Sequence, residues 1–383
     1  MRFAIAALLC LHGLLHLIGF FEPAKDGKSL SVVWLLACGV LVGAAALRLF
    51  DVKPWWLVAA GFGLVLSQVL IVSRWQDARF GTLANAIVLV AVALGAALQA
   101  FEARVQNEAE ALLAGVSREE PAPVTADELA RLPEPVQRWL QRSGVVGKPR
   151  ARTVRLTQAG EMRLKPDGAW MPVTAEQYFD VDAVSFHWSV KTKFLDAVPV
   201  VGRDQLRDGH GHMLVTVLGL VPVPDARGPK IDQGTLLRFL GEIVWFPSAA
   251  LEPYLTWEAV DENSARATLE RGGTKVSAVF TFDAKGRFVK LAAERYLNGE
   301  SLEGWEIPSR AWKRFEGVEV PSQGGAVWKL SGGDFDYYRW RITHLEQNVR
   351  RTFAEEPPHA MVAPEPPHTS SSSPAQPMQS PGS

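Results

Sequence analysis

The sequence has 383 residues, and its 40 Lys and Arg nearly balance its 41 Asp and Glu, which gives a formal net charge of -1. It lacks the basic excess that marks nucleic-acid-binding proteins, so we expect no nucleic acid among its partners. The composition is uneven along the chain. Roughly the first hundred residues are almost purely apolar, whereas the remainder has a soluble composition, so we expect a membrane region followed by one soluble domain.

Four N-terminal segments contain no Asp, Glu, Lys or Arg and are long enough to cross a bilayer as helices. They are residues 3–21, 30–47, 54–73 and 80–101. The first segment has no small-residue cleavage site before Glu22, so we expect it to stay in the chain. Residues 1–104 are thus predicted to form a four-helix, multi-pass anchor in the cell (inner) membrane, with membrane lipids as partners.

The basic residues that flank these segments do not set the orientation of the anchor. An even number of spans puts both ends of the region on one side of the membrane. The basic residues on that side are Arg2, Arg48, Lys53 and Arg104, and those on the other side are Lys25, Lys28, Arg74 and Arg79. The positive-inside rule therefore gives equal counts for the two orientations.

Two histidines, His12 and His16, lie four residues apart and so on one face of the first predicted helix. Ionisable groups inside a membrane are candidates for function, and such a pair could hold haem or a metal ion or relay protons. The four segments supply no carboxylate partner, and Ser67, Gln68 and Asn85 are the other polar groups available. We therefore favour hydrogen bonds between helices and predict no cofactor.

Residues 105–125 are predicted to continue the fourth helix out of the membrane and then to form a linker, since prolines and a glycine interrupt them. Thr125 and Glu128 have the spacing of a capping box. Residues 133–143 form the next predicted helix. The end of the chain is rich in Pro, Ser and Glu, so residues 354–383 are expected to be disordered.

Residues 126–353 are predicted to form a mainly antiparallel β domain. Apolar and polar residues alternate in them, as in Val154 and Leu156 against Arg155 and Thr157, and a period of two is typical of strands with one buried face. Further strands are predicted at residues 173–179, 186–190, 203–209, 212–219, 255–260, 265–270, 275–282, 288–296, 318–330 and 335–344. Short strands joined by tight turns indicate an antiparallel sheet, a sandwich or a barrel.

One apolar helix interrupts this series of strands. Asp232 is its candidate cap, Pro247 ends it, and residues such as Leu236 and Phe239 give it a broad apolar face. A short turn at residues 248–251 follows. We expect the helix to cover one face of a curved sheet.

The soluble part contains the segments GPKIDQG at 228–234, WFPSA at 245–249, YLTWE at 254–258, WEIP at 305–308 and DFDYYRW at 334–340. In these segments residues 130–350 resemble a bacterial family of uncharacterised membrane-anchored proteins, which implies no activity. The architecture of that family resembles the lipoprotein-carrier (Lol-type) fold, a half-open antiparallel barrel closed by a helix. This resemblance implies a cavity for acyl chains and favours the extracytoplasmic side, whereas the four-helix anchor departs from the soluble carriers.

The sequence contains no Walker loop and no GxGxxG, GxSxG, HExxH or paired CxxC motif. Both cysteines, Cys10 and Cys38, fall in the apolar part, so the soluble domain has neither a disulfide framework nor a thiolate zinc site. These absences favour a binding protein over an enzyme.

Asp208, His210 and His212 form a candidate metal site. Residues two apart on a strand share a face, and two imidazoles with a carboxylate could hold zinc or a similar ion. The glycines between them fit equally well with a solvated turn.

A second candidate site is a ligand-binding set around the apolar helix. Its members are Arg238, Glu242, Trp245, Tyr254, Trp257, Tyr338 and Trp340. Arg238 and Glu242 are four residues apart and can pair along the helix, either as an ordinary surface ion pair or at the mouth of a cavity, where Arg238 would meet an anionic head group. Clustered aromatic residues fit either a packed core or the wall of an apolar cavity.

The sequence thus predicts a membrane-anchored module that binds a lipid or other hydrophobic ligand. One alternative is a metal-dependent enzyme that uses Asp208, His210 and His212. The other is a protein-interaction scaffold, with a protein partner on the soluble domain, which predicts a filled barrel without a cavity and an exposed apolar patch.

Overall fold

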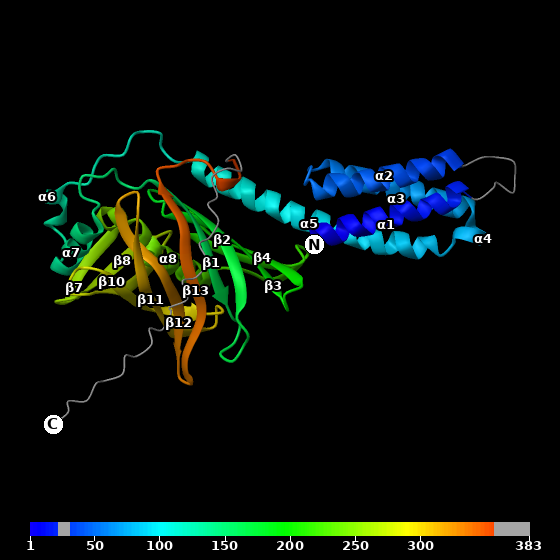
Figure 1. Ribbon diagram of the computed structural model, residues 1–383. Helices are drawn as coiled ribbons and strands as arrows, with labels where there is room; N and C mark the ends of the chain where they lie inside the picture. Colours follow the sequence, from blue (N-terminus) through cyan, green and yellow to red (C-terminus); the bar gives the residue numbers. More distant parts are fainter. Residues whose placement is uncertain (22–30, 356–383) are drawn as a thin grey trace, which may run out of the picture.

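The structure, a computed structural model, describes residues 1–21 and 31–355. Figure 1 shows two regions, a bundle of long helices and a β domain, joined by one helix that belongs to both. The loop with Lys25 and Lys28 and most of the tail predicted to be disordered lie outside the described residues. The start of that predicted tail is ordered, because Ala354 and Glu355 belong to the short 3-10 helix η3 (Phe353–Glu355).

The β domain contains a 13-stranded antiparallel sheet with the strand order β6-β5-β4-β3-β2-β1-β13-β12-β11-β10-β9-β8-β7. The strands are β1 (Thr153–Met162), β2 (Met171–Asp180), β3 (Ser185–Phe194), β4 (Val198–Arg207), β5 (His210–Val217), β6 (Val221–Arg227), β7 (Leu255–Asp261), β8 (Ser264–Arg271), β9 (Thr274–Phe282), β10 (Phe288–Leu297), β11 (Ser301–Phe315), β12 (Val318–Leu330) and β13 (Gly333–Gln347). The first strand pairs with the last, so the sheet is open between β6 and β7. This arrangement confirms the half-open barrel.

The sequence pattern does not predict two of these strands, β6 and β11, and proline explains both. β6 contains Pro222 and Pro224 and lies at the edge of the sheet, where proline is tolerated. β11 contains Pro308 and has neighbours on both sides, but its register with β12 shifts between Ser309 and Ala311. Proline is compatible with a sheet at such an irregular point in the ladder.

Helix α8 (Pro229–Glu242) closes the barrel between the two halves of the sheet. It packs against β4 and β5 on one side and against β9 and β10 on the other. Two short 3-10 helices, η1 (Ile243–Trp245) and η2 (Pro247–Leu251), continue it. Side chains such as Leu236 and Phe239 lie in the main hydrophobic core. The predicted helix over a curved sheet is thus confirmed.

The predicted cap of this helix is wrong. Gly228, with φ of 104°, precedes the first helical residue, Pro229, and Asp232 lies inside the first turn. The Asp232 carboxylate instead accepts a hydrogen bond of 2.7 Å from the backbone N–H of Gly211 and lies 3.3 Å from His210 Nδ1. Asp232 therefore ties the start of α8 to β5.

The two halves of the sheet also meet at a pair of glycines. Gly209, in the turn between β4 and β5, has φ of 82°, and Gly272, in the turn between β8 and β9, has φ of 57°. A Cβ atom on Gly209 would stand 2.6 Å from the Cα atom of Gly272. Glycine permits both this approach and the positive φ values. The contact therefore joins the β4–β5 turn to the β8–β9 turn next to the start of α8.

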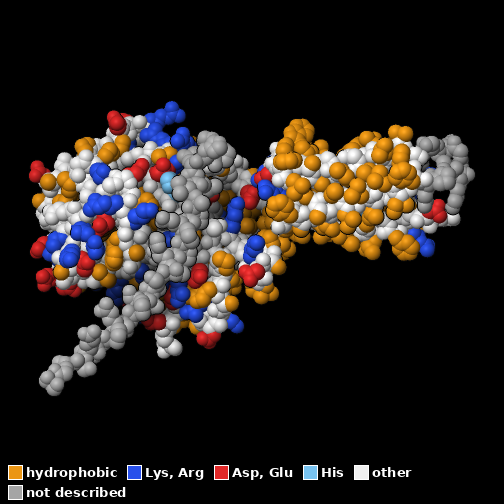
Figure 2. Space-filling view, in the orientation of Figure 1, with side chains coloured by type: hydrophobic (Ala, Val, Ile, Leu, Met, Phe, Trp, Pro, Cys, Tyr) orange, Lys and Arg blue, Asp and Glu red, His pale blue; other side chains and the backbone are white. Residues whose placement is uncertain are grey.

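The helical region contains α1 (Arg2–Phe21), α2 (Ser31–Leu49), α3 (Trp55–Ser73), the short α4 (Trp75–Ala78) and the first part of α5 (Gly81–Ala114). Its four long helices are long and apolar enough to cross a membrane. Figure 2 shows apolar side chains covering the outside of this bundle, and Phe62, Val65 and Leu89 are each more than half exposed. Such a surface is unfavourable in water and supports membrane anchoring.

The bundle buries both histidines of α1. His12 Nε2 lies 2.5 Å from Asn85 Oδ1 on α5 and 3.3 Å from Ser67 Oγ on α3. His16 donates a hydrogen bond of 2.9 Å from Nδ1 to the backbone oxygen of His12. The predicted hydrogen bonds between helices are therefore confirmed.

Helix α5 has 34 residues and runs without a break from the bundle onto the β domain, a length of about 51 Å (Figure 1). Phe101 packs there with Val201 of β4 and Leu214 of β5. The predicted continuation of the fourth helix beyond the apolar segment is confirmed. The short helices α6 (Ala126–Leu129) and α7 (Glu134–Ser143) follow, and α6 begins with the predicted capping box.

A buried ion-pair network fixes α5 to the sheet. Glu108 of α5 lies 2.9 Å from Arg203 Nε on β4 and 3.2 Å from His187 Nε2 on β3, and both partners are almost fully buried. Burial by itself raises the pKa of Glu108, but hydrogen bonds from His187 and Arg104 and the charge of Arg203 outweigh it and lower the pKa to about 2. The ionised form of Glu108 therefore stabilises the docked helix.

We predict that Glu108→Gln destabilises the protein at pH 7 by on the order of 2–3 kcal/mol. The pKa of Glu108 falls from 4.5 to about 2 on folding, so its contribution is complete above pH 4.5 and is lost as the pH falls toward 2. The unfolding free energy of the full chain in detergent is measured from pH 7 to pH 3 for the unmodified protein and for the variant. The difference between the two should shrink below pH 4.5. The control is Glu110→Gln, two residues along α5. Equal losses for the two variants would contradict the assignment.

Candidate functional site

A cavity of about 560 Å³ lies between α8 and the inner face of the first half of the sheet. This volume falls within the range of sites for small ligands, roughly 300–1,000 Å³. Most of its wall is apolar and comes from β1 to β6. The apolar residues of that part are Met162, Leu164, Met171, Val190, Phe194, Val200, Met213, Val215, Val217, Val223 and Pro224.

The alternation of the strands decides which side chains form this wall. On β4, Val200 and Asp204 face the cavity, whereas Val201 between them packs against α5. On β5, Met213 and Val215 face the cavity and Leu214 packs against α5 in the same way. A strand pattern with a period of two therefore supplies both an apolar cavity and a docking surface for the helix.

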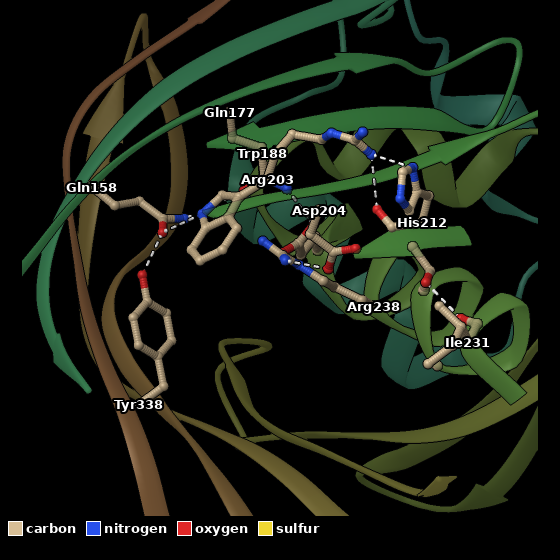
Figure 3. A network of polar contacts seen from close by, with 12 residues as sticks. Gln158, Gln177, Trp188, Arg203, Asp204, His212, Ile231, Arg238 and Tyr338 are labelled. Carbon is tan, nitrogen blue, oxygen red and sulfur yellow. Dashed lines mark hydrogen bonds and ion pairs between the residues drawn. The ribbon is translucent and has the colours of Figure 1, made fainter. Parts of the chain in front are cut away.

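A buried polar network forms the base of the cavity (Figure 3). Arg238 of α8 donates a hydrogen bond of 2.8 Å from Nε to Glu242 and one of 2.9 Å from Nη1 to Asp204. Gln177 donates one of 2.7 Å to the other oxygen of Glu242. The guanidinium also lies 4.5 Å from the centre of the Trp188 ring.

This network corrects the interpretation of Arg238 and Glu242 as a surface pair. Their side chains are only 15% and 8% exposed, because β4 packs against α8 and the rings of Phe186 and Trp188 on β3 lie against the guanidinium. Burial by itself lowers the pKa of Arg238, but the charges of Glu242 and Asp204 outweigh it and raise the pKa. Burial raises the pKa of Glu242 despite the opposing charge of Arg238.

The charge around Arg238 also argues against an anionic head group at this point. One guanidinium faces two carboxylates, Asp204 and Glu242, which already engage its Nε and Nη1 atoms. A further cavity-lining guanidinium, Arg295, lies 4.7 Å from the Trp305 ring centre and donates a hydrogen bond to the backbone oxygen of Gly234. Three arginines and two carboxylates line the cavity, and the third arginine, Arg203, is paired with Glu108 of α5 at 2.9 Å, so the formal charges balance once this partner is counted.

Apart from Arg203 Nε, which is ion-paired with Glu108, two buried polar atoms of cavity-lining residues have no hydrogen-bond partner within residues 1–21 and 31–355. They are Asp204 Oδ1, an acceptor, and Trp245 Nε1, a donor. Buried polar groups are normally paired, because an unpaired one costs about 1–3 kcal/mol. Two residues of the cavity wall therefore carry one unpaired acceptor and one unpaired donor, and both atoms are buried.

The structure divides the predicted ligand-binding set. Arg238, Glu242, Trp245, Tyr338 and Trp340 line the cavity. Tyr254 and Trp257 do not. Tyr254 donates a hydrogen bond to the Val181 backbone oxygen and Trp257 donates one to Ala250, and both pack against the main core.

Sequence reasoning missed the methionines of the wall. Met162, Met171 and Met213 all line the cavity, and they are three of the six methionines in the chain. Methionine is flexible and polarisable, so it adapts to apolar ligands of varied shape. Only Met213 lies in a predicted strand, whereas Met162 and Met171 lie just outside predicted strands, so the sequence pattern gave little signal for this wall.

The predicted metal set is not assembled. Asp208 lies in the turn after β4 with φ of 54°, so it does not share a strand face with the histidines. His210 pairs with Asp232, whereas His212 is buried and lies 2.6 Å from Asp225 and 2.9 Å from Arg203. Within the described part of the chain, no three His, Cys, Asp or Glu residues are grouped so that they could hold a metal ion.

Residues 122–340 match the family of unknown function DUF6544, and the chain belongs to this family. It is similar to the structure of an outer membrane lipoprotein-sorting protein domain from Vibrio parahaemolyticus, with a TM-score of 0.35 and 10% identity over 58% of this chain and 94% of that chain. It is also similar to a DUF1329 family protein from Desulfovibrio piger, with a TM-score of 0.30 and 9% identity over 59% of this chain and 94% of that chain. No curated protein matches it.

We predict that Arg238→Met destabilises the protein by about 3–5 kcal/mol, because it leaves two buried carboxylates without their cation. Adding Glu242→Gln to this variant should recover part of the loss, since it removes one of the two charges. The control is Arg310→Met, whose guanidinium is 48% exposed beside Asp336 and should contribute at most about 1 kcal/mol. Chemical unfolding of the full chain in detergent measures all three. Similar losses in Arg238→Met and the control would refute a buried network.

Proposed function

We propose that the chain is a membrane-anchored module that binds a lipid or other hydrophobic ligand in the cavity beside α8. The observation that carries this proposal is the cavity of about 560 Å³ with its wall of valine and methionine side chains. Small-ligand sites have this combination of an apolar wall and few polar groups. Folding that leaves such a space unfilled forgoes packing energy, which a ligand would restore.

The polar groups at the base support an amphiphile that is uncharged or zwitterionic. Arg203, Arg238 and Arg295 are balanced by Glu108, Asp204 and Glu242, so a ligand with a net charge would leave one charge uncompensated in an apolar space. A hydroxyl, amide or ester group of the ligand would pair with the acceptor Asp204 Oδ1 or the donor Trp245 Nε1, after a side-chain movement that brings these buried atoms to the cavity surface. The apolar part of the ligand would lie along β3 to β5.

The alternatives have less support. A protein-interaction scaffold predicts a filled barrel, whereas this barrel holds a cavity. A metal-dependent enzyme needs the three ligands Asp208, His210 and His212 on one face, whereas Asp208 lies in a turn. A protein partner on the outer surface of the β domain is compatible with ligand binding and stays a proposal.

We propose further that the four long helices make the chain a multi-pass protein of the inner membrane, with the β domain on the extracytoplasmic side. Their length and apolar surface support the anchor. The side rests on the resemblance of the family's architecture to the lipoprotein-carrier (Lol-type) fold, because the basic residues around the spans are equal in number on the two sides.

The orientation predicts the behaviour of reporters fused after Ser383. Alkaline phosphatase needs disulfides, which form outside the reducing cytoplasm, so its fusion should be active and a green fluorescent protein fusion dark. An inactive phosphatase fusion together with a bright fluorescent fusion would place the β domain in the cytoplasm and overturn this part of the proposal.

The cavity predicts co-purification of a lipid. We expect native mass spectrometry of the detergent-solubilised full chain to show a bound apolar species that organic solvent extracts, and a neutral naphthylamine fluorophore to displace it. Val215→Trp, which fills the cavity wall, should weaken binding of the fluorophore by at least about tenfold.

The matched control is Val260→Trp on β7, where the valine is exposed and does not line the cavity. Its affinity for the fluorophore should equal that of the unmodified protein. Equal binding in both variants would place the ligand elsewhere, and a protein without extractable ligand or fluorophore binding would contradict the proposed function.

A further inference from the structure

Two hairpin tips with exposed apolar side chains lie at one end of the cavity wall. The turn between β3 and β4 exposes Phe194 and Leu195 together with Asp196, and the turn between β5 and β6 exposes Leu220 and Val221. Leu195 is 77% exposed and Leu220 is 54% exposed. Phe194 and Val223, close to the two tips, also line the cavity. A soluble domain rarely exposes so many large apolar side chains at one end.

These tips lie beside the apolar part of α5. Gly219, in the turn between β5 and β6, approaches α5 so closely that a Cβ atom on it would stand 2.8 Å from Leu98 N and 2.9 Å from Ala97 C. Figure 1 shows β3 and β4 likewise pointing toward the helical bundle. This end of the cavity wall therefore lies next to the end of the bundle.

A set of ion pairs marks the membrane interface at the same place. Glu102 is the first charged residue after the apolar run of α5, and it pairs with Lys53 before α3 at 3.2 Å and with Lys191 of β3 at 3.0 Å. Charged groups of this kind stay in the interfacial layer. Ala97 precedes Glu102 by five residues, so the tip at Gly219 lies about 7 Å further toward the hydrocarbon core.

We propose that the two hairpin tips insert into the membrane leaflet next to the β domain, and that the cavity takes its ligand directly from that leaflet. The uptake of a ligand rests on the proposed function. The insertion of the tips rests only on the geometry described above. The partner is the lipid leaflet because the tips lie at the depth of the apolar span, where a soluble protein partner would compete with lipid. Lys191 and Lys193 beside the first tip suit the phosphate layer, since basic residues flank apolar side chains that enter membranes.

The insertion is tested with single cysteines that carry an environment-sensitive fluorophore at position 195 or 220. The full chain, with Cys10→Ala and Cys38→Ala, is placed in phosphatidylcholine nanodiscs that contain spin-labelled acyl chains. The fluorescence of the probe at each of these positions should be quenched by the spin label on the lipid and should be protected from quenching by aqueous iodide. The control is a cysteine at position 285, in the turn between β9 and β10, which should show the reverse. Iodide quenching of all three positions would overturn the insertion.

Loading from the leaflet is tested with the paired change Leu195→Asp and Leu220→Asp. Charged side chains at these tips should slow transfer of a fluorescent neutral lipid from vesicles by about tenfold or more, because charge is costly at membrane depth. Binding of the neutral naphthylamine fluorophore in detergent should stay unchanged, which shows that the cavity is intact. The control pair, Val260→Asp and Leu302→Asp, alters exposed apolar residues of β7 and β11 and should leave both measurements unchanged.

The two experiments separate the inference from the function on which it rests. Unchanged transfer from vesicles in the paired tip variant, with normal binding in detergent, would overturn loading from the leaflet and leave ligand binding intact. Absence of fluorophore binding in the unmodified protein would overturn the proposed function, whereas quenching by spin-labelled lipid would still establish insertion of the tips.

Discussion

The alternation of side chains on β3 to β5 is the constraint on which the rest of the structure depends. Successive residues of a strand point to opposite faces, so two neighbours on β4, Val201 and Val200, serve different partners. One face holds α5 by apolar contact and by the Glu108 network, and the other face lines the cavity. A one-residue shift in register would exchange the two faces and destroy both functions at once.

The buried charges at the base follow a related logic. Arg238 is stable there because two carboxylates and an aromatic ring replace the water that it loses. Five charged groups, Arg203, Asp204, Arg238, Glu242 and Arg295, line one cavity, and this cost in burial supports the proposal that the cavity recognises a polar group. The rest of the cavity wall would contact the apolar part of the proposed ligand.

Much of the fold was predictable because its signals are local. The spans follow from the absence of charge over the needed length, and most strands follow from a period of two. The prolines of β6 and β11 masked two strands, because a sheet edge and a register shift depend on distant neighbours. For Asp208 the signal was present and was misinterpreted, since an Asp-Gly pair between alternating residues is typical of a hairpin turn.

The candidate site was only partly predictable for the same reason. The spacing of Arg238 and Glu242 correctly predicts that they pair, but not that β3 and β4 bury them. Tyr254 and Trp257 look the same in sequence as Trp245 and Trp340, and only the packing against the main core separates the two groups. A cavity is a gap between elements far apart in the chain, so no local pattern reports it.

The unbroken course of α5 has a consequence for the mechanics of the protein. A helix without a hinge transmits rotation as well as distance, so the azimuth of the β domain is set by the number of residues between the bundle and Glu108. One inserted residue would turn the domain by about 100° around the helix axis and raise it by about 1.5 Å. The length of α5 thus sets both the distance of the β domain from the bundle and the direction in which its cavity faces. A change in the length of this helix would be tolerated only in near-integral turns.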